Sequence, residues 1–325
     1  MTVLPLARRL PRVGVGRAAW IVGAVVLVAV PWLAGDYTTT LLTRALSFGL
    51  LAVSVALLAG TAGLPTLGQT APYACGAYAT ALLVRAGVAV GPVQLVAAAA
   101  AGALFAGLTA IVVVRTRGVA VLMVTLAVGQ LAVVAAGRWR GVTGGTDGLV
   151  ALDPPRPFWG LPQLGSDQAV YLYALGVAAA VTLIVAAALR TPAGLLLRGC
   201  AEHEGRMLAS GHPVHRYLAL AYVGAGAVAG VAGSLLVTAN QYVAPSDAGF
   251  TTAALALLAV VIGGATSLPG ALAGAAVVLA VRDWLAAPLP GHAPLLLGVV
   301  FVAAAYLLPD GVAGLARRLL RGRHE

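Results

Sequence analysis

Long apolar runs follow one another along almost the whole chain, separated by short segments rich in glycine, proline or arginine. A transmembrane helix needs about 20 mainly apolar residues, whereas the strands of a membrane barrel alternate apolar and polar positions. The runs show no such alternation. The pattern therefore predicts an all-α polytopic membrane protein with about ten transmembrane helices, some of them broken. The expected spans are residues 18–34, 41–60, 73–84, 93–114, 118–136, 169–189, 217–239, 250–262, 271–286 and 294–308.

Helix-breaking sequences interrupt the apolar pattern at Gly63–Pro72 and at Gly263–Gly270. The two sequences look alike, which hints at an internal duplication, although an Ala-, Gly- and Leu-rich chain can produce the same similarity. A broken helix at membrane depth requires that its freed backbone face protein or a water-filled cavity. Residues at the first break, in the span 118–136 and after the span 217–239 are candidates for a translocation path, or else they serve helix packing. The candidates are Gly68, Gln69, Thr125, Gln130, Asn240 and Ser246.

Composition supports a membrane protein. Hydrophobic residues make up 61% of the 325 residues and charged residues 9%, and the mean hydropathy is +0.97. A soluble domain carries roughly 25% charged residues, so this chain cannot cover a water-facing surface. The net charge of +10 comes from arginine alone, since the chain contains no lysine. The arginines lie between apolar runs, so membrane topology explains them, and the expected partner is membrane lipid, with no nucleic acid.

The arginines also predict which segments face the cytoplasm. Fourteen of the 20 lie in residues 1–17, 115–117, 190–216 and 311–325. Because cytoplasmic loops are enriched in arginine and lysine, we expect all four segments in the cytoplasm. The chain then consists of a basic N-terminus (1–17), a transmembrane domain (18–310) and a basic tail (311–325), with both termini cytoplasmic. Residues 138–167 form the main extracytoplasmic loop. The first span is typical of an uncleaved signal anchor, with a cleavable signal peptide as the alternative.

Residues 190–216 form the longest interior segment that is too polar for a bilayer. Arg198, Glu202 and Arg206 are spaced i, i+4 and i+8, so on one helix they form a stripe of alternating charge. Gly211 predicts the C-terminal end of that helix, and Pro213 hinders a restart. The segment therefore predicts a short amphipathic helix on the cytoplasmic side, suited to contact with a soluble partner.

No catalytic residue and no metal site is predicted. The phosphate-binding loop of many ATPases requires a lysine, so this chain cannot hydrolyse ATP by that route. The middles of the spans hold almost no ionisable side chains, which argues against an ion-coupled carrier and against an intramembrane hydrolase. One cysteine and three histidines have spacings that zinc sites use, but we interpret them as ordinary polar residues, because such spacings recur by chance. They are Cys200, His203, His212 and His215. A disulfide between Cys200 and Cys75 is not expected.

Six stretches carry a resemblance to a known family. They are Gly63–Leu83, Arg117–Gln130, Thr143–Leu149, Thr191–Tyr222, Val243–Phe250 and Val261–Ala275. The most specific is Thr143–Leu149, with the sequence TGGTDGL, and Thr191–Tyr222 contains an acidic and basic pattern, Glu202-x-Glu204-x-Arg206. Together these stretches resemble the LivM-type permease subunits of branched-chain amino-acid ABC importers. The resemblance covers about residues 40–310.

The resemblance implies a multi-pass subunit of a bacterial cell-membrane importer that translocates branched-chain or other apolar amino acids. It implies separate ATPase subunits that bind the ATP, a second homologous permease subunit and an extracytoplasmic solute-binding protein, with no cofactor in this chain. The residues that it implies for coupling to the ATPase are Glu202, Glu204, Arg206 and Gly211. A permease for urea or short amides and a stand-alone secondary carrier are the alternatives.

Residues 190–216, which we name the coupling segment, depart from the family pattern at two glycines and at one dipeptide. Gly199 and Gly205 stand where the family has better helix formers, and each costs a helix about 1 kcal/mol relative to alanine. His212-Pro213 replaces a more flexible polar pair. These departures indicate coupling that is weaker or specific to its partner, and they leave room for a substrate that differs from the family's.

Overall fold

The structure is a computed structural model that describes residues 27–32, 35–150, 154–158, 160 and 162–285, and five single residues beyond them. The predicted basic N-terminus (1–17), the tenth span (294–308) and the tail (311–325) therefore lie almost wholly outside the described residues, as does most of the first span (18–34).

The described part of the chain is built from helices, and it contains no β-strand. The elements are α2 (Asp36–Ala56), η1 (Leu57–Ala62), α3 (Thr70–Arg85), α4 (Gly91–Val113), α5 (Val119–Arg138), α6 (Arg140–Thr143), η2 (Gly145–Asp147), α7 (Asp167–Ala188), α8 (Pro192–Glu202), α9 (Glu204–Ala209), α10 (Val214–Asn240), η3 (Pro245–Ala248), α11 (Phe250–Gly263), α12 (Leu268–Ala280) and η4 (Val281–Leu285). Five helices among these residues are long and apolar enough to cross a membrane: α2 with η1, α4, α5, α7 and α10. The prediction of an all-α membrane protein is confirmed.

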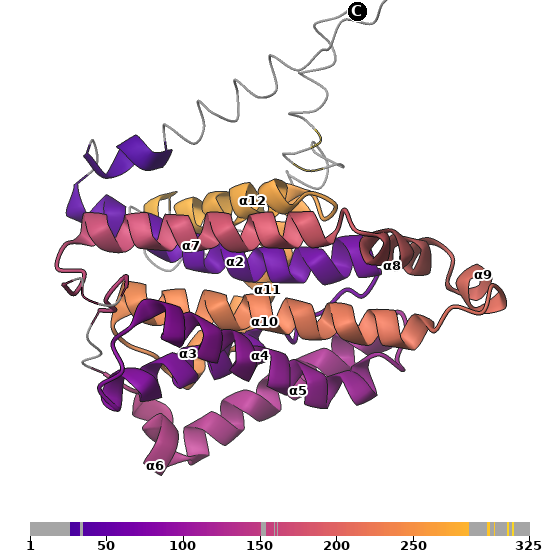
Figure 1. The fold of residues 1–325 in the computed structure, drawn as a ribbon, viewed down its shortest axis with the longest axis horizontal. Helices are drawn as coiled ribbons and strands as arrows, with labels where there is room; N and C mark the ends of the chain where they lie inside the picture. Colours follow the sequence, from indigo (N-terminus) through magenta and orange to yellow (C-terminus); the bar gives the residue numbers. More distant parts are fainter. Residues whose placement is uncertain are drawn as a thin grey trace, which may run out of the picture.

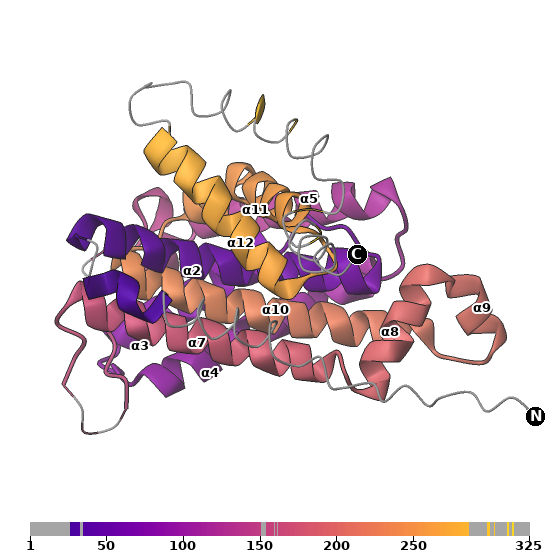
Figure 2. The ribbon, with the colours of Figure 1, turned by 90° about the horizontal axis from the view of Figure 1, so that it is seen from above.

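Helices α2 and α10 form the centre of the bundle, and the other long helices pack around them (Figures 1 and 2). The most apolar stretches of α2–η1 and α10 are 78% and 67% buried, whereas that of α5 is 17% buried. Glycines allow the close packing, because a Cβ atom on Gly230 of α10 would lie 2.1 Å from the carbonyl oxygen of Ala98 in α4. Small residues are the usual means by which transmembrane helices approach each other closely.

Within the described residues, helices lie at the positions of the second to ninth predicted spans, with shifted ends. The second span begins at Asp36 and ends with the π-helical turn η1 at Ala62, beyond its predicted limits. The third begins at Thr70 rather than residue 73, because Pro72 lies in the first turn of α3, where a backbone N–H has no helical partner to lose. The expectation that Pro213 hinders a restart is wrong, since α10 begins at the next residue.

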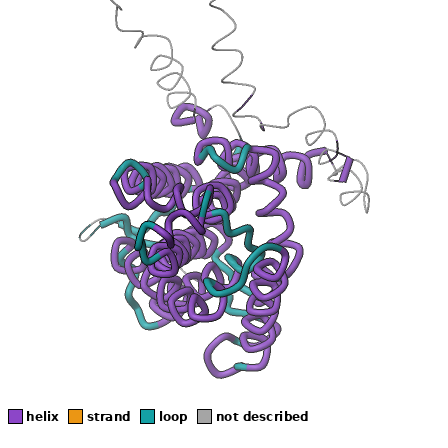
Figure 3. The backbone as a smooth tube through the Cα atoms, turned by 90° about the vertical axis from the view of Figure 1, so that its right-hand side faces the viewer, coloured by secondary structure: helices purple, strands orange, loops and turns teal. Residues whose placement is uncertain are grey.

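The two ends of the bundle carry different segments. Helices α8 and α9 extend from one end of the bundle, and α6 lies toward the opposite end (Figure 1). Figure 3 views the bundle from the α8 and α9 end, along the axes of the long helices. The loop between α4 and α5 reaches the α8 end, since Arg117 contacts Glu204 there. Two of the predicted cytoplasmic segments, 115–117 and 190–216, thus lie on the same side of the bundle, as the arginine pattern requires.

Candidate functional site

The coupling segment, residues 190–216, is not the single helix that the charge spacing predicts. Helix α8 ends at Glu202, His203 has a non-helical backbone (φ −147°, ψ 76°), and α9 starts at Glu204. Arg206 therefore does not share one helix with Arg198 and Glu202, and the predicted stripe of alternating charge is wrong. All three of these side chains are exposed.

Gly199 of α8 lies against α9 where the segment turns at His203. A Cβ atom on Gly199 would lie 3.2 Å from the sulfur of Met207, so the missing side chain leaves room for α9 to approach α8. The interior side of α8 is apolar, with Leu197 and Cys200 buried against the bundle. Gly211 follows the end of α9, as predicted for a helix stop: its φ is +80°, a left-handed conformation that favours glycine.

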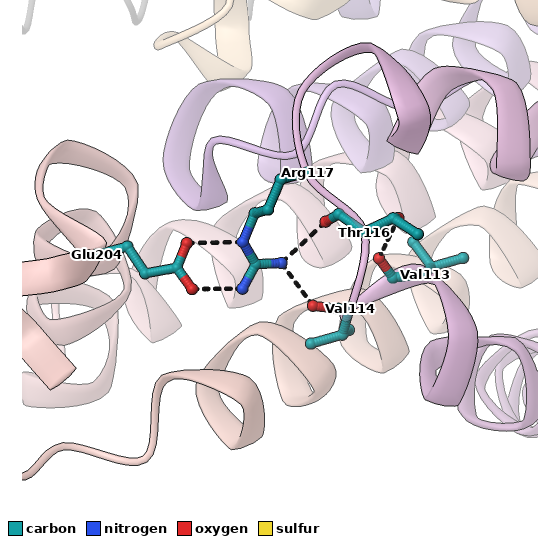
Figure 4. A network of polar contacts seen from close by, with 5 residues as sticks. All are labelled: Val113, Val114, Thr116, Arg117 and Glu204. Carbon is teal, nitrogen blue, oxygen red and sulfur yellow. Dashed lines mark hydrogen bonds and ion pairs between the residues drawn. The ribbon is translucent and has the colours of Figure 1, made fainter.

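Glu204 binds Arg117, a residue of the loop between α4 and α5 (Figure 4). The Arg117 Nε donates to one carboxylate oxygen at 2.6 Å and Nη2 donates to the other, in the forked geometry that suits a guanidinium and a carboxylate. The remaining nitrogen, Nη1, donates to the carbonyl oxygens of Val114 (2.5 Å) and Thr116 (2.9 Å). The ion pair holds the pKa of Glu204 below its ordinary value and raises the pKa of Arg117.

The coupling segment also packs directly on the first helix break. A Cβ atom on Gly63, where φ is +66°, would lie 3.2 Å from the Cβ of Ala201 in α8. The second break lies against the same region, because a Cβ on Gly60 would meet the carbonyl oxygen of Ala265 at 1.9 Å. Gly264, like Gly63, has a positive φ. The second break therefore contacts η1, the π-helical turn that leads into the first break.

Helix α5 holds the non-helical part of the first break, residues 63–69. The Leu67 N–H donates to Oγ1 of Thr125 at 3.2 Å, and Thr125 in turn donates to its own helix at Val121 O (2.7 Å). Gly68 packs on the same residue, since a Cβ there would lie 2.7 Å from the Thr125 carbonyl oxygen. Thr125 is fully buried. The break therefore depends on α5 for a hydrogen-bond acceptor and for its packing.

The remaining path candidates fall into two groups. Gln69 is buried, and both polar atoms of its amide lack a hydrogen-bond partner among the described residues. Gln130, further along α5, is half-buried. Asn240 ends α10, and its buried Oδ1 also lacks a partner within the described part of the chain, while Ser246 is exposed in η3. The structure thus brings Gly68, Gln69 and Thr125 together, and it places Asn240 at the end of α10 and Ser246 in the segment that follows.

Comparison with known proteins identifies the family. A family model described as "Branched-chain amino acid transport system / permease component" matches residues 37–305. The chain belongs to this family. It is 27% identical to the high-affinity branched-chain amino acid transport system permease protein LivM of Escherichia coli (strain K12), and equally to LivM of Salmonella typhimurium (strain LT2). Each alignment covers 91% of this chain and 75% of the relative. No solved structure matches the chain significantly.

Family membership confirms the resemblance and gives the chain its class. It is a multi-pass membrane permease component of a branched-chain amino-acid transport system, and a permease component is not an enzyme in the usual sense. Membership of this family implies that the chain associates with ATPase and binding-protein partners.

The glycine-rich loop of this permease, Thr143–Leu149, is held against the segment after α10. Leu149 and Val243 exchange two backbone hydrogen bonds, at 2.8 Å and 3.0 Å. Gly148 has a φ of +74°, and a Cβ there would lie 2.2 Å from the carbonyl oxygen of Val243. This docking explains why the loop requires glycine, and it fixes the neighbourhood of Asn240 and Ser246.

The cysteine and histidines of the permease's coupling segment show no shared site. Cys200 is buried in α8, His203 is exposed at the bend between α8 and α9, and His215 is exposed on α10. Among the described residues, no group of three or more His, Cys, Asp or Glu side chains is arranged to hold a metal ion.

Proposed function

We propose that this permease translocates branched-chain or other apolar amino acids across a bacterial cell membrane, driven by separate ATPase subunits. A second homologous permease subunit and an extracytoplasmic solute-binding protein complete the assembly. The observation that carries the proposal is the connection between the exposed coupling segment and the helix break, formed by the packing of Ala201 on Gly63. A displacement of α8 is thereby transmitted to the one part of α2–α3 that is not helical.

The coupling segment is the proposed docking surface for an ATPase subunit. Glu202, Arg206 and Gly211 are exposed on α8, α9 and the turn that follows. No ion pair engages the side chain of Glu202 or Arg206 within the described residues, so these charges are available to a partner. Their opposite signs suit a partner surface that carries both charges.

The proposed translocation path runs beside the first break. Gly68, Gln69 and Thr125 lie together there, and the amide of Gln69 provides both a donor and an acceptor to a polar group of a passing solute. Gln130 continues the path along α5, and Asn240 and Ser246 belong to its other end. An extended backbone at membrane depth is typical of transporter substrate sites.

The proposed topology has about ten transmembrane helices, with both termini and the coupling segment in the cytoplasm. Support comes from the position of residues 115–117 and 190–216 at one end of the bundle, because both carry arginine clusters. Residues 138–167 then form the extracytoplasmic loop, against which the solute-binding protein docks.

Reconstitution tests the function. The partner subunits are first identified from the genes that neighbour this one, and the full assembly is then placed in liposomes with ATP inside and the binding protein outside. We expect uptake of labelled leucine, isoleucine and valine that requires ATP and every subunit. Uptake of urea or acetamide in preference to leucine would instead support the permease for short amides. Uptake by this chain alone, without ATPase, would overturn the proposal in favour of a secondary carrier.

A further inference from the structure

Glu204 joins the coupling segment by an ion pair to another part of the same chain. Its carboxylate receives a forked pair of hydrogen bonds from Arg117, and the guanidinium is fixed from behind by the carbonyl oxygens of Val114 and Thr116 (Figure 4). All three guanidinium nitrogens are thus used. Such a forked arrangement fixes direction as well as distance, which a lysine in place of Arg117 could not reproduce.

The pair joins two segments that are 87 residues apart in the sequence. Glu204 is the first residue of α9, and Arg117 lies two residues before the start of α5. The side chains are 37% exposed for Arg117 and 31% exposed for Glu204. Water therefore screens the pair, and its contribution lies in geometry rather than in a large gain in folding stability.

Helix α5 connects the ion pair to the first helix break. Thr125 stands two turns into α5, and its Oγ1 accepts the hydrogen bond from Leu67 in the break. Ala201 of α8 contacts the start of the break at Gly63. The break is therefore held on one side by α8 and on the other side by α5, and the Arg117–Glu204 pair ties these two supports together.

We propose that Glu204 is a positioning residue that acts through Arg117, so that α5 moves together with α8 and α9 when the coupling segment is displaced. Without the pair, α8 can shift while α5 stays in place. The displacement then reaches the break through Ala201 and Gly63 alone, and α5 does not follow it. Glu202, two residues earlier, has no such internal partner among the described residues and belongs to the docking surface. This inference rests on the proposed function, namely that an ATPase subunit displaces the coupling segment.

A charge-exchange experiment in the reconstituted complex tests the link. The variants are Arg117→Glu, Glu204→Arg and the double variant, with Glu202→Arg as the matched control. Each is assayed for co-purification with the ATPase subunits and for ATP-dependent uptake. We expect each single variant of the pair to retain the ATPase and to lose roughly three- to tenfold in uptake, and the double variant to recover most of that loss. Glu202→Arg should reduce co-purification, and Arg117→Glu should not rescue it.

Three results would overturn the inference. Loss of the ATPase subunits from Glu204→Arg, without rescue by Arg117→Glu, would make Glu204 a contact for the partner. Unchanged uptake in both single variants, or a double variant no better than the worse single, would show that the pair transmits nothing.

Folding and the proposed function are checked separately. If charge reversal lowers the yield of monodisperse protein, the cycle is repeated with Arg117→Gln, Glu204→Gln and their combination, where a linked pair gives losses that are less than additive. Failure of the wild-type complex to transport would refute the proposed function itself, whereas an additive cycle in a working complex refutes only the link.

Discussion

Replacement of Thr125 by valine removes the hydroxyl that holds the helix break and leaves the shape of the side chain almost unchanged. The Leu67 N–H then loses its acceptor, Thr125 Oγ1 at 3.2 Å, in a site where Thr125 is fully buried. A buried donor left without a partner costs about 1–3 kcal/mol. Loss of the hydrogen bond that Thr125 donates to Val121 O adds little to this cost, because the same carbonyl also accepts a backbone hydrogen bond within α5.

Thr238→Val is the matched control for this change. Thr238 is also a buried helical threonine, and within the described part of the chain its hydroxyl donates only to Ser234 O of its own helix, at 3.0 Å. Thermal unfolding of the purified protein in detergent compares the two variants with the wild type. We expect Thr125→Val to be less stable than Thr238→Val by about 1–3 kcal/mol and to transport more slowly in the complex. Equal stability of the two variants would refute the reasoning that α5 satisfies the backbone of the break.

Three further substitutions test other parts of the structure. Gly230→Ala should give little folded protein, because its Cβ would lie 2.1 Å from Ala98 O, whereas Gly224→Ala on the same helix, with nothing within 4 Å, should yield normal amounts. Gly148→Ala, at a positive φ and 2.2 Å from Val243 O, should undock the loop and speed hydrogen exchange at the Leu149 and Val243 amides, and Gly141→Ala should not; unchanged exchange contradicts the docking. The Arg117 guanidinium, with a smaller effect from His215, lowers the pKa of Glu204, so the pair's contribution is complete above the ordinary glutamate pKa of about 4.3 and is lost as the pH falls through the lowered value. The difference in melting temperature between wild type and Glu204→Gln should therefore be constant from pH 6 to 8 and shrink in acid, and a difference independent of pH would contradict the pairing.

The sequence predicts the long helices because their evidence is local. Each of α4, α5, α7 and α10 is a run of apolar residues, and that run alone decides that it is helical in a membrane. The first break was equally visible, since Gly63 and Pro65 cannot continue a helix easily. Helix ends were less predictable, because a helix tolerates proline in its first turn or directly before it. Pro72 lies in the first turn of α3, and Pro213 directly precedes α10.

The site was only partly predictable, since its main contacts join distant residues. Spacing alone places Arg198, Glu202 and Arg206 on one helix, but the bend at His203 puts Arg206 on a second helix, which packs its Met207 against Gly199. The pairing of Glu204 with Arg117 has no local signal at all. The presence of both residues in stretches that resemble the family was the available hint, and the contact itself required the structure.

The most direct test of the account is to determine on which side of the membrane the coupling segment lies. A single cysteine at Ser210, which is exposed after α9, is introduced into a variant with Cys75→Ala and Cys200→Ala, and a second variant carries Thr146→Cys in the opposite loop as a control. Each is treated with a membrane-impermeant maleimide in right-side-out and inside-out vesicles. We predict that Ser210→Cys is labelled only in inside-out vesicles and Thr146→Cys only in right-side-out vesicles. Labelling of Ser210→Cys in right-side-out vesicles would contradict the account.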